Sequence, residues 1–443
     1  MDAPYPCNGL TAPTTTELIA TASPAKQQYF LQTVCENLAS IADGTMPEEQ
    51  IMQEAKILRA EENQRGFGTY GGLAKTLFGD EGLGLVNAPE HGLRSLDVDR
   101  FRAWVGRCFT AQNAVATLHN EPPELDALSL LLQGERLAVL AVDPIIEEFP
   151  TKVPMQHGVG LLAVVERKPG VPSMVAILHD AATERLRQSM GVSYAPTFDY
   201  QPLSGDTASI FGCSDVVPEA ASAVPEVFVE ELTRLAESGP TPSEVEKQVA
   251  DYHEARTTAA FEAGHLESTA FELLVDGKVF DRAALDAGFS DLSSEEIQEA
   301  AKGLLENSLI GVSFENTESV ASIPMFGGFP PDAVPEGETI RFKSHRESKF
   351  PDGEPLLVVT DDSITTIFPP TGPCTIKASE IRSVLAWDDG TREVYGPDGR
   401  AALLGASHWE NYETLRARID GWAAKVRRFR KTSSAGGVLY LTE

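Results

Sequence analysis

The first part of the chain has the periodicity of amphipathic helices. Helices are predicted from about residue 24, from 47 to about 64, and from 98, where Asp97 is the expected cap. Their inward faces are expected to carry Phe30, Val34, Leu38, Ile51, Ala55, Leu58, Phe101, Trp104, Val105 and either Cys108 or Phe109. A short strand is expected at 114–118. This part is therefore predicted to be mostly helical.

Further along the chain, strand patterns alternate with helical ones. Strands are predicted at 137–142, 160–166, 192–200, 209–217 and 309–314. A helix is predicted at 172–190, ended by Gly191, with an apolar stripe formed by Val175, Leu178, Ala182 and Leu186. Two capping boxes, at 241–244 and 293–296, should each open a helix with a polar face. This alternation predicts a sheet covered by helices.

The last third of the chain has a different pattern. Residues 316–355 are rich in Pro and Gly, which makes them the best domain boundary. Several short strands with turn signals follow, and a long amphipathic helix is predicted at 409–429. A small twisted sheet capped by one helix satisfies this pattern, and it resembles a pleckstrin-homology-like module.

Charge and composition exclude several classes of protein. The net charge of -30 argues against binding to nucleic acid or to anionic membranes, because both need a surplus of Lys and Arg. The sequence has no apolar run long enough to span a membrane and no signal-peptide pattern at its start. Its five cysteines are widely spaced, which favours reduced thiols in the cytosol. We therefore expect a cytoplasmic globular protein.

Two carboxylates stand out in the helix predicted at 47–64. Glu54 and Glu61 are seven residues apart and so lie on one helical face, two turns from each other. The ordinary explanation is strong, because Glu is a good helix former and this helix contains five of them. Spacing alone therefore does not assign these residues a function.

The same helix carries a resemblance to the pitrilysin/insulinase family of zinc metallopeptidases, or inverzincins. Their H-x-x-E-H motif is followed by a later helix of the pattern E-x-x-x-[VI]-x-x-E and then by a segment ending near N-A-V. Here these positions are Glu54, Leu58 and Glu61, with Asn113-Ala114-Val115 downstream. The resemblance implies that Glu61 is the third zinc ligand and that Glu54 is the carboxylate that orients the site. Leu58 departs from the pattern, which has Val or Ile at this position.

A second match to this family lies in the part that starts at residue 158. The family has an Arg and a Tyr seven residues apart, found here as Arg187 and Tyr194, and residues 239–244 are a further match. The resemblance implies that Arg187 and Tyr194 hold the substrate backbone and the developing oxyanion. The ordinary alternative is a cation at a helix end and a strand aromatic in the core. The two matches imply two related halves between about residues 5 and 320.

The zinc-binding motif itself is absent from the sequence. No two of the eight histidines are four residues apart, so neither H-x-x-E-H nor H-E-x-x-H occurs. In the family, H-x-x-E-H precedes the segment that residues 5–18 resemble, so we expect the chain to start inside the first domain. Without the motif helix, the apolar faces around Phe30, Val34, Ile51 and Leu58 should be exposed.

The expected fold is α+β: two insulinase-like α/β half-domains, the first incomplete, and a small β-rich, helix-capped domain. The expected segments are an incomplete N-terminal metallopeptidase-like domain (1–120), a connector (121–157) and an insulinase-like domain (158–320). A Pro- and Gly-rich linker (321–355) and the β-rich domain with its C-terminal helix (356–443) follow.

The expected function is that of a catalytically incomplete peptidase homologue from a bacterial cytoplasm, acting on peptides or unfolded polypeptides. Zinc is expected only if the missing motif is supplied, and none for this chain alone. The alternative is a binding or scaffold subunit that pairs with an active homologue. A third possibility is an interaction role for the C-terminal module with its basic end at 425–431, although a cationic helix end stabilised by the helix dipole is the favoured explanation of that segment.

Overall fold

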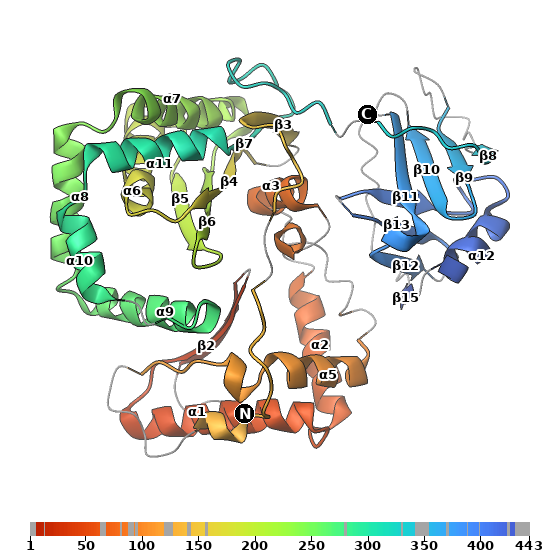
Figure 1. The fold of residues 1–443 in the computed structure, drawn as a ribbon, viewed down its shortest axis with the longest axis horizontal. Helices are drawn as coiled ribbons and strands as arrows, with labels where there is room; N and C mark the ends of the chain where they lie inside the picture. Colours follow the sequence, from red (N-terminus) through yellow and green to blue (C-terminus); the bar gives the residue numbers. More distant parts are fainter. Residues whose placement is uncertain are drawn as a thin grey trace. The chain divides into compact units, whose positions relative to one another are not determined.

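A computed structural model describes most of the 443 residues as a mixture of helices and sheets, which confirms the predicted α+β class (Figure 1). The described residues are 6–12, 14–62, 68–79, 82–86, 93, 96–118, 127–139, 143–155, 158–278, 281–328, 331–341, 354–368, 372–387, 389–397, 399–422 and 426–429. The chain divides into two compact units. The first unit consists of Met1–Glu54, Phe67–Leu73 and Asp97–Phe326. The second unit consists of Ala55–Gly66, Ala74–Leu96 and Gly327–Glu443.

The N-terminal part is mostly helical, as the periodicity predicts. Its elements are β1 (Cys7–Thr11), β2 (Thr16–Ala20), α1 (Pro24–Ala42), α2 (Glu48–Glu62), α3 (Gly68–Phe78), η1 (Gly82–Leu85) and α5 (Val98–Cys108). The strands β1 and β2 form an antiparallel hairpin, and α1 packs against α5. Asp97 caps α5 as predicted, because its side chain accepts a hydrogen bond from the Arg100 amide.

Two of the predicted inward residues, Leu58 and Trp104, are on the surface. Trp104 is 44% exposed and stacks on Phe101 instead of entering the core. The expectation that apolar faces are exposed holds for Leu58, which is 43% exposed, but not for Ile51, which is buried. The hairpin is apolar and exposed as well, at Leu10, Leu18 and Ile19.

Two predicted strands are wrong. Residues 114–118 form no strand, and the described part of 137–142 is irregular and mostly exposed. A strand needs a neighbouring strand to pair with its backbone groups. Here a backbone group bonds to a side chain and not to a neighbouring strand: the Leu137 amide donates a hydrogen bond to the Asn113 side chain.

A five-stranded sheet is the centre of the next part. Its strands are β3 (Thr151–Met155), β4 (Gly160–Glu166), β5 (Thr197–Pro202), β6 (Thr207–Cys213) and β7 (Leu309–Ser313). They lie in the order β3-β7-β4-β6-β5, and only β3 and β7 pair in parallel. The strands predicted at 160–166 and 309–314 are confirmed, and those predicted at 192–200 and 209–217 are present but shifted, to 197–202 and 207–213.

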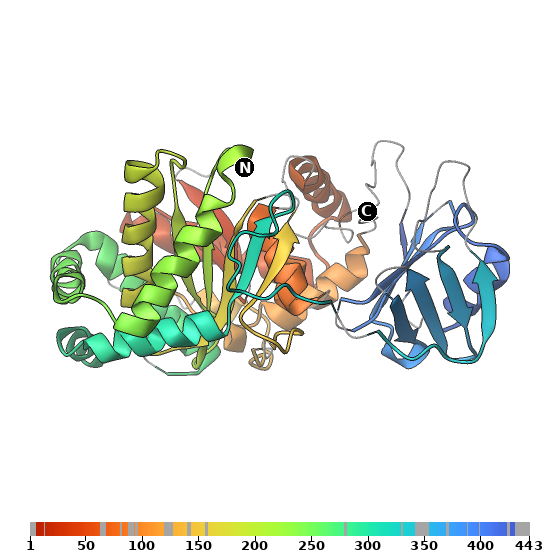
Figure 2. The same cartoon turned by 90° about the horizontal axis from the view of Figure 1, so that it is seen from above.

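Helices cover one face of this sheet, as Figures 1 and 2 show. These helices are α6 (Gly170–Ala182), α7 (Ala223–Ser238) and α11 (Ser294–Glu306), and α8 (Pro242–Ala255), α9 (Ala259–Val275) and α10 (Arg282–Ser290) extend from them. Alternate β4 residues, Leu161, Ala163 and Val165, share one buried cluster with α6, α7 and α11. Tyr70 of α3 contacts Phe211 of β6, with ring centroids 5.1 Å apart. Both predicted capping boxes are present, at the starts of α8 and α11.

The C-terminal part contains two four-stranded sheets and one helix. One sheet has the order β11-β10-β9-β8 and the other β14-β13-β12-β15. The elements are β8 (Glu338–Arg341), β9 (Leu356–Val359), β10 (Ser363–Phe368), β11 (Gly372–Lys377), β12 (Ser383–Trp387), β13 (Arg392–Tyr395), β14 (Ala401–Leu404), α12 (Tyr412–Trp422) and β15 (Val426–Phe429). A single hydrophobic cluster joins both sheets to α12, so the predicted β-rich, helix-capped architecture is confirmed, with two sheets in place of one.

The long final helix predicted at 409–429 is wrong in its length. The helix spans Tyr412–Trp422 only, and Val426–Phe429 forms β15, parallel to β12. Apolar residues at three- and four-residue spacing fitted a helix, but β12 offers a free edge that satisfies the backbone of these residues as a strand. The strand β8 lies inside the segment predicted as a linker.

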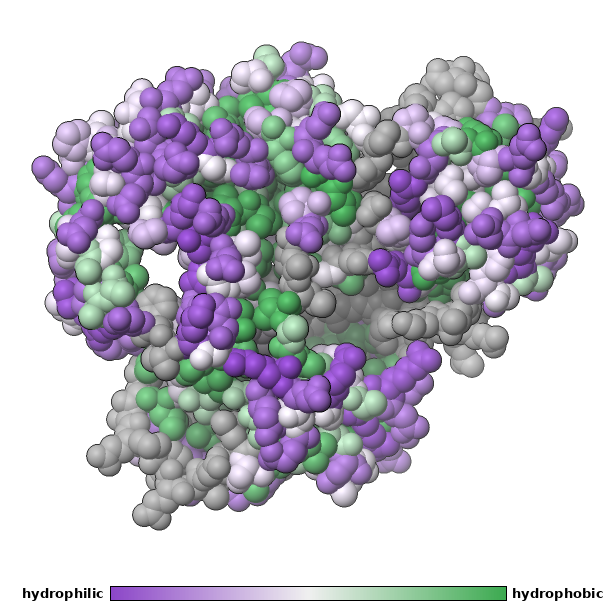
Figure 3. All heavy atoms as spheres, in the orientation of Figure 1, coloured by the Kyte–Doolittle hydropathy of each residue, from purple (hydrophilic) through white to green (hydrophobic). Residues whose placement is uncertain are grey.

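Hydrophilic residues predominate over α7 and α8 on the face drawn in Figure 3. Within the described residues, no helix combines the length and the hydrophobicity needed to cross a bilayer.

Candidate functional site

Arg187 and Tyr194 lie on either side of the turn that ends the α6 helix. Past Ala182 the helix continues as a π-helical segment, η4, from Thr183 to Ser189. Its apolar stripe is buried as predicted, with Leu178, Ala182 and Leu186 all in the core. Gly191 then takes a φ of 64°, which favours glycine and ends the helix. Short π-helical segments are frequent at functional sites, and this one carries Arg187.

The turn brings the two predicted residues into contact. The Arg187 guanidinium carbon lies 5.0 Å from the centroid of the Tyr194 ring, within the range of a cation–π interaction. Both side chains are exposed, Tyr194 by 74%. Tyr194 is therefore not the core aromatic of the ordinary alternative. The guanidinium and the phenol hydroxyl are both hydrogen-bond donors and can bind a peptide carbonyl or a carboxylate.

An ion-pair network holds the π-helical segment that carries Arg187. Arg185 contacts Glu230 and Glu231 of α7, with N–O distances of 2.7 and 3.0 Å. Glu231 also accepts from Arg234, which in turn contacts Glu244 of the first capping box at 2.7 Å. These contacts join the π-helical segment to α7 and α8. Sequence reasoning did not identify Arg185, because its partners are about 45 residues away and no spacing rule connects them.

The roles of Glu61 and Glu54 at a metal site stay a prediction. Glu54 is an exposed residue of α2, and the Glu61 side chain is outside the described residues. Among the described residues, no three His, Cys, Asp or Glu side chains are grouped so that they could hold a metal ion. Zinc in the peptidase family that the motifs resemble needs two imidazoles and a carboxylate, and the sequence lacks the paired histidines. The residues present therefore do not fit zinc.

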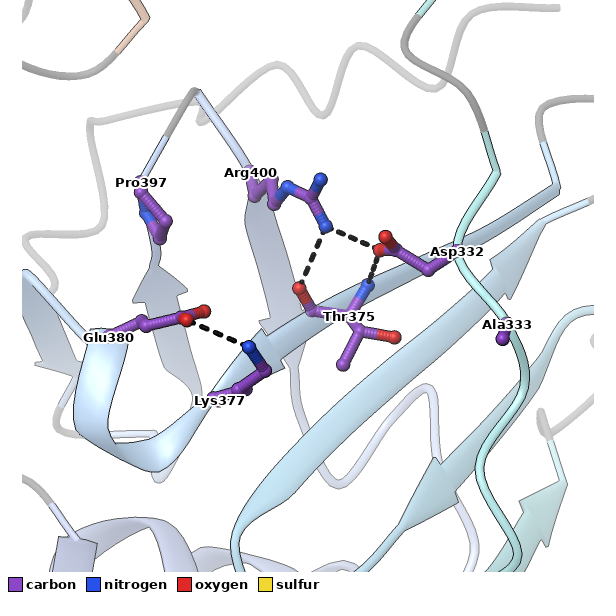
Figure 4. Close-up of a pocket in the computed structure, with 7 residues that line it drawn as sticks. All are labelled: Asp332, Ala333, Thr375, Lys377, Glu380, Pro397 and Arg400. Atoms are coloured by element: carbon purple, nitrogen blue, oxygen red, sulfur yellow. Dashed lines mark hydrogen bonds and ion pairs between the residues drawn. The ribbon is translucent and has the colours of Figure 1, made fainter.

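The C-terminal part contains a hollow of about 380 Å³ (Figure 4). Its charged side chains bind one another: Arg400 pairs with Asp332, and Lys377 donates to Glu380 at 3.0 Å. Asp332 also accepts from the Thr375 amide at 2.7 Å. Two cations and two anions leave the lining neutral, and their mutual contacts occupy the groups that would recognise a ligand. We therefore place the candidate site at Arg187 and Tyr194.

No family model matches the sequence, and neither does any curated protein. The fold is similar to a solved structure described as the peptidase M16 inactive domain from Pseudomonas fluorescens. The two are 14% identical with a TM-score of 0.51, over 67% of this chain and 77% of that one.

A second similar structure is Complex III2 from Candida albicans, solved with Inz-5 bound. It is 10% identical with a TM-score of 0.51, over 69% of this chain and 81% of the matched chain. At such low identity, the likeness shows a shared fold. The chain therefore has the insulinase-like fold of peptidase M16 domains, as its motifs predict.

Proposed function

We propose that this protein is a catalytically incomplete insulinase-like peptidase homologue that binds extended polypeptide through Arg187 and Tyr194. The observation that carries the proposal is the exposed contact between these two side chains on a domain of this fold. The same sequence contains no H-x-x-E-H, so it lacks the histidines and the general base of the family reaction. Binding without cleavage is the activity that this combination supports.

The pair is suited to hold a peptide backbone. Neither side chain makes a hydrogen bond or an ion pair within the described part of the chain, so their donors are available to a ligand. The Tyr194 ring restricts where the guanidinium can lie, which lowers the entropy lost on binding. Zinc is expected only when another polypeptide segment supplies the missing motif, and Glu61, with Glu54, is the proposed contribution of this chain to such a site.

Metal content and peptidase activity test the incomplete site. We expect purified protein to retain far less than one zinc per chain after dialysis and to leave fluorescein-labelled β-casein intact. Atomic emission spectroscopy and gel electrophoresis measure the two quantities. One tightly bound zinc per chain, or casein cleavage that a chelator abolishes, would contradict the proposal.

Substitution of the pair tests the binding role. Arg187→Gln and Tyr194→Ala are each expected to weaken β-casein binding about tenfold, which corresponds to about 1.4 kcal/mol. Fluorescence anisotropy of labelled casein gives the Kd. Arg100→Gln is the matched control, because it removes another exposed Arg of the same unit and should leave the Kd unchanged. Equal affinity of the wild-type protein and the three variants for β-casein would exclude Arg187 and Tyr194 as the binding residues.

A binding or scaffold subunit is the second candidate function. The exposed pair is accessible to a second protein as well as to a peptide, and one similar fold belongs to a structure described as Complex III2. In this arrangement Arg187 and Tyr194 would complete the site of a homologue that contains H-x-x-E-H. Co-purification with such a homologue would support this role, and monomeric behaviour in its presence would argue against it.

A further inference from the structure

One carboxylate holds the loop that carries Tyr194. The Oδ1 atom of Asp215 accepts hydrogen bonds from the Ala195 amide at 2.7 Å, the Tyr194 amide at 3.2 Å and the Ser193 hydroxyl at 3.0 Å. The Ser193 hydroxyl is also hydrogen-bonded to the Ser214 hydroxyl. Asp215 therefore contacts three consecutive residues, and Tyr194 is the middle one.

The rest of the loop is fixed on either side of these contacts. Before Tyr194, the amides of Val192 and Ser193 donate to the Leu186 carbonyl at 2.9 and 3.3 Å. Ser193 also forms an isolated antiparallel bridge with Val216. Asp215 supplies the acceptor for the next two amides, Tyr194 and Ala195, before β5 begins at Thr197.

The charge of Asp215 suits this role. The amide of Ala195, with the Ser193 hydroxyl and the Tyr194 amide, lowers the pKa of Asp215 below its ordinary value. The carboxylate is therefore ionised at neutral pH, and hydrogen bonds to an ionised acceptor are stronger than those to a neutral one.

We propose that Asp215 is a positioning residue, which holds the Tyr194 ring beside the Arg187 guanidinium and so prepares the pair for polypeptide. This inference rests on the proposed function for its consequence in binding. Asp215 does not need to touch the ligand, because its contacts are to the loop. It lies on the surface, so its loss should disorder the pair without unfolding the domain.

The test follows the environment of the Tyr194 ring by its NMR chemical shift, in the full chain labelled with ¹³C-tyrosine. Tyr194→Phe identifies the Tyr194 signal among the nine tyrosines, and Arg187→Gln gives its position when no cation lies beside the ring. In Asp215→Ala the Tyr194 signal should move to the Arg187→Gln position, and the Kd for β-casein should rise about fivefold. Asp215→Asn keeps an acceptor oxygen and should show a smaller change in both quantities.

Asp199→Ala is the matched control, because it removes an exposed carboxylate from the neighbouring strand β5 and should leave the Tyr194 signal unchanged. A Tyr194 signal that stays at its wild-type position in Asp215→Ala would overturn the inference, whatever the casein affinity. Absence of casein binding by the wild-type protein would overturn the proposed function, while the Tyr194 signal would still decide the role of Asp215.

Discussion

Replacing Glu272 by alanine is expected to lower the free energy of unfolding by about 3 kcal/mol. Glu272 of α9 pairs with Arg167 at 2.5 Å, and their side chains are only 11% and 17% exposed. The same guanidinium donates to the Ser204 carbonyl at 2.8 Å and to the Tyr200 hydroxyl at 3.3 Å. Alanine at 272 would leave a mostly buried cation without its counter-charge, which costs more than the pair itself contributes.

A neighbouring pair provides the control for this prediction. Glu166 contacts Lys168 at 3.0 Å, but both side chains are well exposed. Exposed ion pairs contribute little, so Glu166→Ala should change stability by less than about 1 kcal/mol. Urea unfolding followed by circular dichroism measures both variants. Equal effects of Glu272→Ala and Glu166→Ala would show that the buried Arg167 charge finds another partner at no cost.

The Arg167–Glu272 pair also shows where sequence reasoning ends. The two residues are 105 positions apart, and no periodicity or motif connects them. Local signals were more informative. The capping boxes at Thr241 and Ser293 were predicted correctly, because each is formed by side chains within one helical turn. Contacts between distant elements depend on how those elements pack, which a single sequence does not specify.

The wrong predictions of secondary structure came from apolar patterns that fit more than one conformation. Residues 426–429 have helical spacing, but β12 pairs with them in parallel and determines their conformation. The segment 137–142 has the apolar composition of a buried strand, yet its described residues have no neighbouring strand to pair with. Backbone pairing across the fold therefore overrode the local pattern in the first case and was absent in the second.

The candidate site was predictable only in part. The seven-residue spacing of Arg187 and Tyr194 pointed to a shared role through family resemblance, and the structure places them in contact. The turn at Gly191 was predicted, but the π-helical segment before it was not, because the spacing of Leu178, Ala182 and Leu186 also fits an ordinary α-helix. The roles of Glu54 and Glu61 stay a prediction, since the Glu61 side chain is outside the described residues.

Replacing Trp409 by alanine is expected to lower the stability of the C-terminal part by about 4 kcal/mol. Trp409 is fully buried, and its indole N–H donates to the Leu403 carbonyl at 3.0 Å. It belongs to the hydrophobic cluster that joins both sheets to α12. Alanine would leave a cavity at the point where these three elements meet, together with a carbonyl that has lost its donor.

The exposed Trp104 is the control, because Trp104→Ala removes the same side chain from a surface of the other unit and should cost less than about 1 kcal/mol. Differential scanning calorimetry separates the possible outcomes. If the two units unfold independently, Trp409→Ala should shift one transition to lower temperature and leave the other in place. A single transition that shifts as a whole would mean that the units unfold together, and the cavity at Trp409 would then destabilise the Arg187–Tyr194 site as well. Unchanged calorimetry would contradict the assignment of Trp409 to the core.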